Sequence, residues 1–334
     1  MKVTIYDVAE RAKVSIATVS KVINSTGRIS EATSQRVREV MKELNYKPSM
    51  VASALTSKKT GTIGLLIPDV SNPYFSEACR RIEDWCRKSG YGVTICNTDN
   101  NDEKTVEYIE LLEQKGIDGL IISSTVQYKK EVIQDLLKKK MPLVLFSTMI
   151  GHLDTNAVTV NGYSGAHKAV EHLIHQGCQK IAFIGEEEWR SGGRMRGYCD
   201  TLVEYGLSLD EDCIKHVNST ISAGKVAIGE ILDSGKKIDG VFAFNDVLAV
   251  GALKEVQARK ISVPNEIKIV GFDNTLLSEI TTPTLSTVAQ PIDEMAQKAV
   301  QLVIESIKNP NARNIKIEIT PELITRESSQ KWLD

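Results

Sequence analysis

The sequence predicts a small all-α unit at the N-terminus followed by a much larger α/β unit. Three observations predict this fold class: apolar residues recur at helical spacing in the first 60 residues, apolar runs alternate with amphipathic stretches beyond residue 61, and the two parts differ in charge. The length of 334 residues also exceeds what one hydrophobic core usually supports. We therefore expect at least two domains.

The composition is that of an ordinary globular protein, with 42% hydrophobic and 25% charged residues. No apolar run reaches the roughly 18 residues that a membrane helix needs, and the first residues lack the apolar stretch of a signal peptide. The six cysteines are dispersed and form no CxxC pair, which is typical of reduced thiols. We expect a cytoplasmic protein, not a secreted or membrane one.

The charge is unevenly distributed. Eleven basic and five acidic residues give the first 60 residues a net charge of +6, whereas the formal charge of −2 for the whole chain leaves −8 for the rest. A small basic unit joined to a larger acidic one suggests a module that binds a polyanion such as nucleic acid. The alternative is a solvated basic face with no partner.

Three short helices are predicted in the N-terminal unit. The apolar positions at helical spacing are Val8, Ala9 and Ala12, then Val19, Val22 and Ile23, and then Val37, Val40, Met41 and Leu44. Ser15 and Ser30 precede the second and third sets and are good N-caps. Two short helices across a tight turn, closed by a third, form a helix-turn-helix, whose second helix can enter the DNA major groove. Because three short helices also occur in proteins that do not bind DNA, periodicity alone leaves the function open.

Two segments of this unit are recognisable. The stretches Thr4–Ala9 and Val14–Asn24 closely resemble the headpiece of LacI/GalR-family transcriptional regulators, and Leu44–Leu55 resembles the hinge of that family. The resemblance continues to about Ser328. It implies a sequence-specific regulator that binds double-stranded palindromic operator DNA as a homodimer.

The resemblance also implies which residues contact DNA. Thr18, Ser20 and Asn24 are expected to contact phosphates. Lys21 stands where the family often has Arg or His. Ile16 and Ala17 are expected to face base edges in the major groove, where they can contact thymine methyl groups. The alternative for Ile16 is packing against the headpiece core. The full set of expected DNA-binding residues is Tyr6, Ser15, Ile16, Ala17, Thr18, Ser20, Lys21, Asn24, Ser49, Met50, Ala52 and Leu55.

The hinge is expected to act from the minor groove. Leu55 corresponds to the leucine that wedges into the central base step. Ser49 and Met50 stand where related hinges commonly have Asn and Arg, so the resemblance does not imply charged contacts to the minor groove there. Since the hinge helix is short, it should form mainly on DNA.

Beyond residue 61 the pattern is that of parallel sheets covered by helices. Helical spacing of apolar residues, as between Phe75 and Cys86, separates apolar runs that predict buried strands. These runs are Ile63–Ile67, Val93–Cys96, Leu120–Ile122, Leu143–Phe146, Ile181–Ile184, Val241–Phe244 and Ile267–Phe272. About 270 residues of this alternation are too many for one such sheet, so two α/β subdomains are expected.

The family resemblance implies a two-lobed, periplasmic-binding-protein-like α/β core. Its three crossovers are placed near Val160-Asn161, Ala289-Gln290 and Thr320-Pro321. The expected domains are a headpiece (1–47), a hinge helix and linker (48–60) and an effector-binding and dimerisation domain (61–334). Within the last, the N-sublobe takes about 61–160 plus 290–320, and the C-sublobe takes about 161–289 plus 321–334. Ligand then binds between the lobes, at the carboxyl ends of strands.

The expected effector-binding residues follow these strands or match the family's effector residues. They are Asp69, Tyr74, Phe75, Ser147, Arg194, Ser219, Asn245 and Asp273. An arginine and an aspartate facing one another suit a polyhydroxylated ligand, because each makes paired hydrogen bonds. Phe75 could instead begin the buried face of a helix, and a carboxylate such as Asp246, and less readily Asp273, could instead be an N-cap.

Two departures from the family pattern concern the kind of ligand. Ser147 stands where many sugar-binding relatives have Asp, and Ser219 stands where relatives often have an aromatic wall. A smaller, less acidic cleft could admit a bulkier or anionic ligand, such as a phosphorylated sugar or a uronate. The effector is therefore expected to be a sugar, a phosphosugar or a uronate.

No enzyme, metal site or cofactor is expected. The sequence has no GxxxxGK[ST], HExxH or GxSxG motif. His167, His172 and His175 lie on one predicted helix, but no third ligand is evident near the pair at i, i+3, so we expect them to be surface residues.

The main hypothesis is a repressor of a carbohydrate-utilisation operon, in which effector binding changes the angle between the lobes and thereby the hinge. No leucine heptad follows Glu327-Ser328-Ser329, so a dimer is expected and not a tetramer. One alternative is a global catabolite regulator whose corepressor is a phosphorylated carrier protein. Another, from a different class, is the sugar-binding protein of a transport system.

Overall fold

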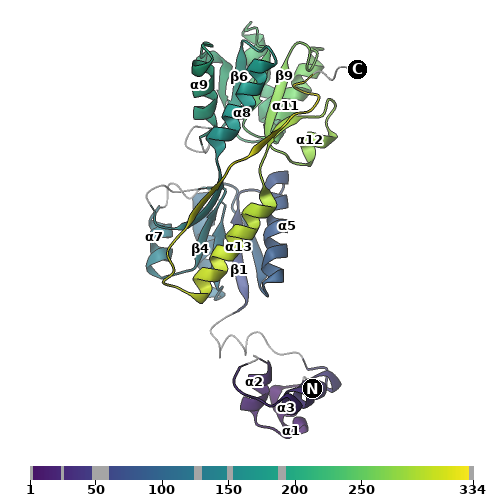
Figure 1. Cartoon of the computed structure of the whole chain (residues 1–334), viewed down its shortest axis with the longest axis vertical. Coiled ribbons are helices and arrows are strands. Elements are labelled where there is room, and N and C mark those ends of the chain that lie inside the picture. Colours follow the sequence, from purple (N-terminus) through teal and green to yellow (C-terminus); the bar gives the residue numbers. More distant parts are fainter. Residues whose placement is uncertain are drawn as a thin grey trace. The chain divides into compact units, whose positions relative to one another are not determined.

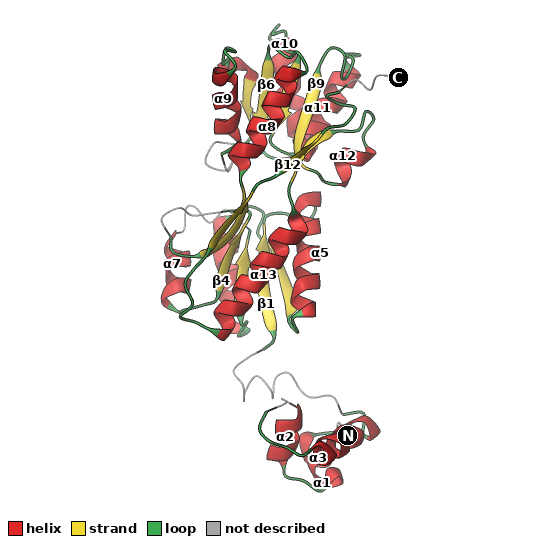
Figure 2. Ribbon diagram, viewed as in Figure 1, coloured by secondary structure: helices red, strands yellow, loops and turns green. Residues whose placement is uncertain are grey.

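The computed structural model describes residues 3–23, 26–46, 60–123, 130–148, 153–186 and 193–330. The chain separates into two compact units, Met1–Thr60 and Gly61–Asp334. Figures 1 and 2 show the helices and strands of each unit. Among the described residues, no helix is both long enough and apolar enough to cross a membrane.

The first unit contains three helices, α1 (Ile5–Ala12), α2 (Ile16–Ile23) and α3 (Glu31–Glu43). The predicted caps are confirmed: the backbone N–H of Thr18 donates to Ser15 Oγ at 3.1 Å, and that of Thr33 donates to Ser30 Oγ at 3.3 Å. All three helices contribute fully or nearly fully buried residues to one small core, namely Val8, Ala9, Ala12, Val19, Val22, Val37 and Val40. The helix-turn-helix prediction is therefore correct.

The second unit is built on two six-stranded sheets. We call the first the N-lobe, with strand order β11-β5-β4-β3-β1-β2, and the second the C-lobe, with order β12-β10-β9-β8-β6-β7. Every neighbouring pair is parallel except β10 and β12, which are antiparallel. The chain passes from the first sheet to the second after β5, returns after β10, and passes again between β11 and β12.

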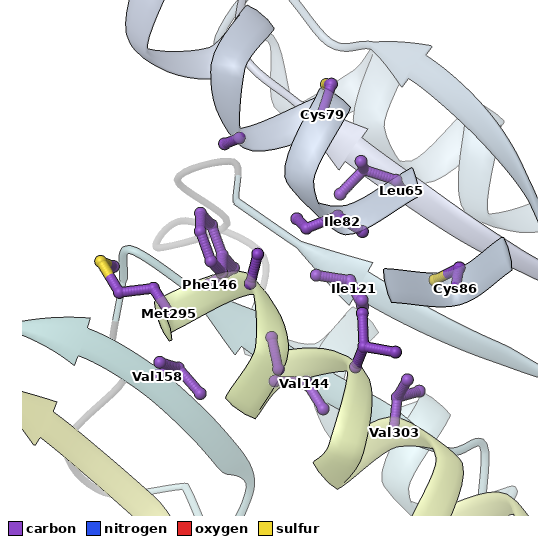
Figure 3. Packing of buried hydrophobic residues seen from close by; sticks show 14 of the residues in the cluster. Leu65, Cys79, Ile82, Cys86, Ile121, Val144, Phe146, Val158, Met295 and Val303 are labelled. Atoms are coloured by element: carbon purple, nitrogen blue, oxygen red, sulfur yellow. The ribbon is translucent and has the colours of Figure 1, made fainter. Parts of the chain in front are cut away.

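The N-lobe elements are β1 (Thr62–Ile67), α5 (Pro73–Lys88), β2 (Gly92–Asn97), α6 (Asp102–Gln114), β3 (Gly119–Ile122), α7 (Lys130–Lys138), β4 (Leu143–Phe146), β5 (Asn156–Val160), α13 (Ile292–Lys308) and β11 (Lys316–Ile319). Helices α5 and α13 lie on one face of this sheet (Figure 1). Figure 3 shows side chains from both helices, among them Ile82 and Val303, packed with strand residues such as Leu65 and Val144. Burial of this apolar surface is the main favourable contribution to the stability of the lobe.

The C-lobe elements are α8 (Gly162–His175), β6 (Ile181–Gly185), α9 (Arg194–Glu204), a 3-10 turn (Glu211–Cys213), β7 (Ile214–His216), α10 (Ile221–Asp233), β8 (Gly240–Ala243), α11 (Asp246–Ala258), β9 (Lys268–Asp273), α12 (Leu276–Ile280), β10 (Ser286–Ala289) and β12 (Glu322–Ile324). Helices α8 and α9 cover one face of its sheet, and α10 and α11 cover the other.

The seven predicted strands are all present, with three corrections. Val93–Cys96 belongs to β2 at the edge of its sheet and is mostly not buried, with Ile95 45% exposed. Phe244 lies just beyond β8, and β9 begins and ends one residue later than predicted. Five further strands, β5, β7, β10, β11 and β12, were not predicted, because their sequences are short or mix polar with apolar residues.

His172 also corrects an expectation, because it is half-buried and not a surface residue. Its Nε2 lies 2.7 Å from the hydroxyl of Ser329, a residue with no exposed surface. Burial lowers the pKa of His172, so this side chain stabilises the packing of the C-terminal segment in its neutral form.

Candidate functional site

The predicted DNA-contacting residues of the headpiece lie at its surface where the structure describes them. Ile16 is 40% exposed and Tyr6 is 67% exposed. Ser15, Ala17 and Lys21 are exposed, whereas Thr18 and Ser20 are partly buried. Ile16 is outside the buried headpiece core, which favours the DNA-facing interpretation over the packing alternative. Asn24, Ser49, Met50, Ala52 and Leu55 lie outside the described residues.

A cleft of about 760 Å³ is lined by residues of both lobes. Its size is within the range of small-molecule sites. All eight residues predicted to bind an effector line it, namely Asp69, Tyr74, Phe75, Ser147, Arg194, Ser219, Asn245 and Asp273. They come mainly from the carboxyl ends of parallel strands and from the helix starts that follow, which is where ligands bind in such sheets.

Arg194 is the first residue of α9 and is held rigidly on the C-lobe wall. Its side chain is 11% exposed, and one guanidinium nitrogen donates to the Phe244 carbonyl at 2.6 Å. The guanidinium carbon lies 3.7 Å from the ring centroid of Phe272 and 4.3 Å from that of Phe244. A second guanidinium nitrogen lies 3.8 Å from Asp273 Oδ1. These contacts fix the orientation of a side chain suited to paired hydrogen bonds.

Asp273 ends β9 in an unusual backbone conformation, with φ 111°. Such a positive φ strains a residue with a Cβ, and strained residues of this kind cluster at functional sites. Asp273 Oδ1 accepts a hydrogen bond of 2.7 Å from Gln290 Nε2. Burial raises the pKa of Asp273 to about 7, although nearby Arg194 lowers it. Burial thus favours the neutral form of this carboxyl group, and Arg194 favours its charged form.

A hydrogen-bonded chain joins the two lobes through Gln290. The Tyr74 hydroxyl, on α5 of the N-lobe, is bonded to the Ser147 hydroxyl and donates to Gln290 Oε1 at 3.2 Å. Gln290, which directly follows β10 at a crossover between the lobes, then donates to Asp273 of the C-lobe. Its position at a crossover is the one signal in the sequence that could have selected Gln290.

The cap of α11 is Asn245, predicted as an effector-binding residue, and not Asp246, for which the cap alternative was given. Asn245 is the N-cap of α11, and its Oδ1 accepts from the Leu248 N–H at 3.0 Å. Asp246 has no exposed surface and accepts from the Thr275 N–H at 2.7 Å and from the Thr287 hydroxyl at 2.6 Å. The interpretation of Asp246 as an N-cap is therefore wrong. Burial raises its pKa to about 6, while these hydrogen bonds lower it.

The lining of the cleft is more acidic than the sequence predicts. The described lining residues include five carboxylates but only one arginine, Arg194, and no lysine. The five are Asp69, Asp99, Glu186, Asp273 and Glu318. Glu186, which was not predicted, follows β6 and accepts from the Ser219 hydroxyl at 2.7 Å. The absence of an acid at Ser147 and of an aromatic ring at Ser219 therefore does not make the cleft less acidic.

The unfolding free energy of the core is expected to fall as pH rises from about 4 to about 8. Asp246 and Asp273 have pKa values of about 6 and about 7 in the folded chain, above the ordinary value near 3.9. The folded chain thus retains protons that the unfolded chain loses, so their contribution is complete below about pH 4 and is lost as pH rises through these values.

Urea denaturation at pH 4.5, 6 and 8 measures this dependence. His172, whose pKa is lowered, acts in the opposite direction, so the informative comparison is between the wild type and Asp273→Asn. The variant should lose less stability over the range. Equal slopes for the two chains would show that Asp273 is not the titrating group.

The headpiece and the two-lobed core together define a class of protein, the helix-turn-helix regulators of transcription with an attached binding domain. Residues 4–49 match the bacterial regulatory proteins of the lacI family, and residues 170–329 match a periplasmic binding protein-like domain. Curated regulators of this family are similar over nearly the whole chain, and the chain belongs to the LacI family.

Two relatives and one solved structure illustrate the similarity. The HTH-type transcriptional regulator DegA of Bacillus subtilis is 37% identical over 98% of both chains. The ribose operon repressor of Halalkalibacterium halodurans is 36% identical, covering 98% of this chain and 97% of the relative. A LacI-family regulator from Enterococcus faecium with bound ribose is 30% identical, with a TM-score of 0.73, covering 80% of this chain and 98% of that one. The chain is thus a DNA-binding transcriptional regulator.

Proposed function

We propose that this regulator is a homodimeric, cytoplasmic repressor of a carbohydrate-utilisation operon, and that a neutral sugar bound between its lobes controls its affinity for a palindromic operator. The observation that supports this most strongly is the pair of Arg194 and Asp273 in the cleft, 3.8 Å apart and both almost buried. Each can hydrogen-bond to two neighbouring hydroxyl groups of a sugar ring. The repressor of a ribose operon among the relatives and the ribose-bound neighbour support the same class of ligand.

The charge of the cleft favours a neutral sugar over a phosphosugar or a uronate. An anionic ligand would bring its charge next to five carboxylates, of which Glu186 and Asp273 belong to the same wall as Arg194. The repulsion is strongest at Glu186 and Asp273, which are partly or fully buried. It is weaker at Asp69, Asp99 and Glu318, which are exposed, and Asp99 is paired with Lys104 outside the lining. Neutral hydroxyl groups instead donate hydrogen bonds to the carboxylates.

The ligand class can be tested by thermal unfolding of the purified chain with a panel of compounds. The panel contains D-ribose, D-glucose, cellobiose, D-ribose 5-phosphate and D-glucuronate. A ligand at 100 times its dissociation constant adds about 2.7 kcal/mol to the unfolding free energy. Stabilisation by a neutral sugar is expected. Stabilisation by the anionic compounds alone would contradict the charge argument, and no effect of any compound would favour the catabolite regulator with a protein corepressor.

DNA binding should depend on residues 1–60, which are basic and contain the helix-turn-helix. A chain that begins at residue 61 should retain sugar binding and lose all binding to DNA. A transport protein would show no selection of operator sequences by the full-length chain, so enrichment of a palindrome from random DNA separates the two classes. The cleft is assigned to binding alone, and each sugar should be recovered unchanged after incubation with the protein.

Leu55→Ala should weaken binding to the selected operator about tenfold or more while leaving binding to random DNA and to sugar unchanged. The reason is the proposed wedge of Leu55 in the central base step, since a bent site gains contacts that unbent DNA does not offer. Fluorescence anisotropy with both DNAs measures this. Equal losses on the two DNAs would contradict the wedge.

A further inference from the structure

The turn that follows β9 has a backbone conformation that is uncommon for its residues. Asp273 has φ 111° and the next residue, Asn274, has φ 56°, and left-handed values of this kind are uncommon outside glycine. Two successive residues in such a conformation persist only where contacts from elsewhere in the fold fix them. Since Asp273 lines the cleft, the contacts that fix this turn also fix the position of its carboxyl group.

Asp246 forms hydrogen bonds to this turn from inside the C-lobe. Its Oδ2 accepts from the backbone N–H of Thr275 at 2.7 Å and from the hydroxyl of Thr275 at 2.9 Å. Its Oδ1 accepts from the Thr287 hydroxyl at 2.6 Å, and the oxygen of that hydroxyl accepts from the Asn274 N–H at 3.2 Å. The carboxylate therefore holds the two backbone N–H groups that follow Asp273, one directly and the other through Thr287.

The backbone of β9 leaves room for this carboxylate. A Cβ atom on Gly271, two residues before Asp273, would lie 2.6 Å from Asp246 Oδ1. A side chain on Gly271 would therefore displace the carboxylate that holds the turn. Asp246 thus lies against the chain both before and after Asp273.

Two other roles that a carboxylate at this position could have do not account for Asp246. Asn245 caps α11, since its Oδ1 accepts from the Leu248 N–H at 3.0 Å. Asp246 has no exposed surface and is not part of the cleft lining, so it does not itself contact a ligand there. Burial of a carboxylate costs free energy, which its hydrogen bonds and the charge of Arg326 offset. The remaining role is to hold the turn that carries Asp273.

We propose that Asp246 is a positioning residue for the effector: it holds the turn after β9 so that the carboxyl group of Asp273 meets the sugar next to Arg194. The proposal rests on the proposed function and adds a residue that acts on the sugar only through Asp273. A preformed geometry strengthens binding because the ligand does not have to order it. Loss of these hydrogen bonds should therefore weaken sugar binding more than the loss of a hydrogen bond elsewhere in the lobe.

Asp246→Asn tests the proposal, because it keeps the shape of the side chain and replaces one acceptor oxygen by a donor. Calorimetric titration measures the neutral sugar, from D-ribose, D-glucose and cellobiose, that binds the wild type most tightly. The substitution should weaken binding about tenfold. A charge effect has the opposite sign: the charge of Asp246 raises the pKa of Asp273, so its removal favours charged Asp273, the better acceptor. Weaker binding therefore indicates a change in geometry and not in charge.

A double substitution shows whether Asp246 acts through Asp273. Asp273→Asn alone removes the carboxylate that is positioned. Adding Asp246→Asn to that chain should change the affinity for the sugar by no more than about twofold, because the two residues act as a unit. If the two losses add instead, Asp246 affects the sugar by another route and the positioning role is wrong.

Thr287→Val and Thr287→Ser test the same contacts without changing the carboxylate, and they decide the matter if Asp246→Asn does not fold. The first removes the hydroxyl group that connects Asp246 to the Asn274 N–H, and the second keeps it. Only Thr287→Val should weaken sugar binding, and the recovery in Thr287→Ser shows that the hydroxyl group is responsible.

Tyr198→Phe provides the matched control. The Tyr198 hydroxyl is buried in the same lobe and donates to the Ile181 carbonyl at 2.7 Å, but Tyr198 is not part of the cleft lining. Its removal costs a buried hydrogen bond far along the chain from the turn. The melting temperature of Tyr198→Phe should fall, while its sugar binding should equal that of the wild type.

The outcomes separate the two proposals. If Asp246→Asn and Thr287→Val bind the sugar as the wild type does while Arg194→Ala does not, the positioning role is wrong and the proposed function stands. Equal weakening in Thr287→Val, Thr287→Ser and Tyr198→Phe would also overturn the positioning role, because any loss of stability in the C-lobe would then weaken binding. If no sugar binds the wild type, the proposed function fails and the positioning role fails with it.

Discussion

Arg194→Ala is expected to weaken sugar binding at least about 100-fold while the headpiece remains folded. A hydrogen bond from a charged group is worth about 1.5–3 kcal/mol, and the guanidinium can form two with neighbouring sugar hydroxyls. The stacking on Phe272 and the hydrogen bond to the Phe244 carbonyl pre-organise this geometry. The substitution also removes the cation that lowers the pKa of Asp273, so that carboxyl group becomes more fully protonated at neutral pH and accepts hydrogen bonds less well.

Calorimetric titration with the neutral sugar measures the loss of affinity in Arg194→Ala. Two further variants test whether this loss is specific to the guanidinium group of Arg194. Arg194→Lys keeps the charge but not the planar fork, and should bind between wild type and Arg194→Ala. Arg196→Ala is the matched control, because Arg196 is on the same helix, is exposed, lies over the ring of Tyr163, and is not part of the cleft lining. Unchanged binding by Arg194→Ala would remove the main support for the cleft as the effector site.

Gly251→Ala is expected to destabilise the C-lobe by about 2 kcal/mol or more. Gly251 lies on α11 where that helix packs against α10, and a Cβ atom there would lie 2.3 Å from the carbonyl oxygen of Ile221 and 2.8 Å from the backbone nitrogen of Lys225. Backbone atoms cannot rotate away, so the two helices must separate. This cost exceeds the gain of about 1 kcal/mol that alanine brings to a helix interior.

Gly229→Ala is the control from the same pair of helices, and its effect should have the opposite sign. The atoms nearest to a Cβ on Gly229 would belong to the flexible side chains of Arg259 and Glu255, the nearest at 3.3 Å, and not to the backbone. Helix propensity then favours alanine, and stability should rise slightly or stay unchanged. Chemical denaturation of both variants measures the difference. Similar stabilities would show that the close crossing of α10 and α11 tolerates a side chain.

The parts of the fold that local signals determine could be predicted from the sequence. In the headpiece, helical periodicity and the caps Ser15 and Ser30 act within a few residues of each other, and the three helices follow. The central strands β1, β3, β4, β6, β8 and β9 are buried on both sides and are therefore almost entirely apolar. The edge strand β11, Lys316–Ile319, alternates exposed and partly buried residues over only four positions, which is too short a pattern to distinguish from a loop.

The strand β10, Ser286–Ala289, is the more instructive failure. Its Ser286 and Thr287 are fully buried, which propensity does not predict for polar residues. They are buried because their hydroxyl groups find partners far away in the sequence, on the C-terminal segment and on Asp246. No local pattern in the sequence contains that pairing.

The candidate site was predictable as far as the positions after predicted strands and the family resemblance reached. Among the residues selected are Arg194 and Asp273, which the structure brings together, but neither signal selected Gln290 or Glu186. Gln290 is marked in the sequence only by its position at a crossover, which does not show what such a residue does. Its role becomes visible only when the strands of both lobes are in place and the hydrogen-bond partners can be counted.

The central claim is that a sugar between the lobes and the operator at the headpiece affect one another's binding, and reciprocity tests it most directly. The affinity of the full-length chain for its selected operator is measured with and without saturating sugar, and the affinity for the sugar is measured with and without operator. Thermodynamic linkage requires that the two ratios be equal, and an allosteric coupling of about 1–3 kcal/mol makes each roughly 5- to 150-fold. We predict equal ratios in this range, both lost in Arg194→Ala. An operator affinity that is the same with and without a sugar shown to bind the cleft would contradict the account.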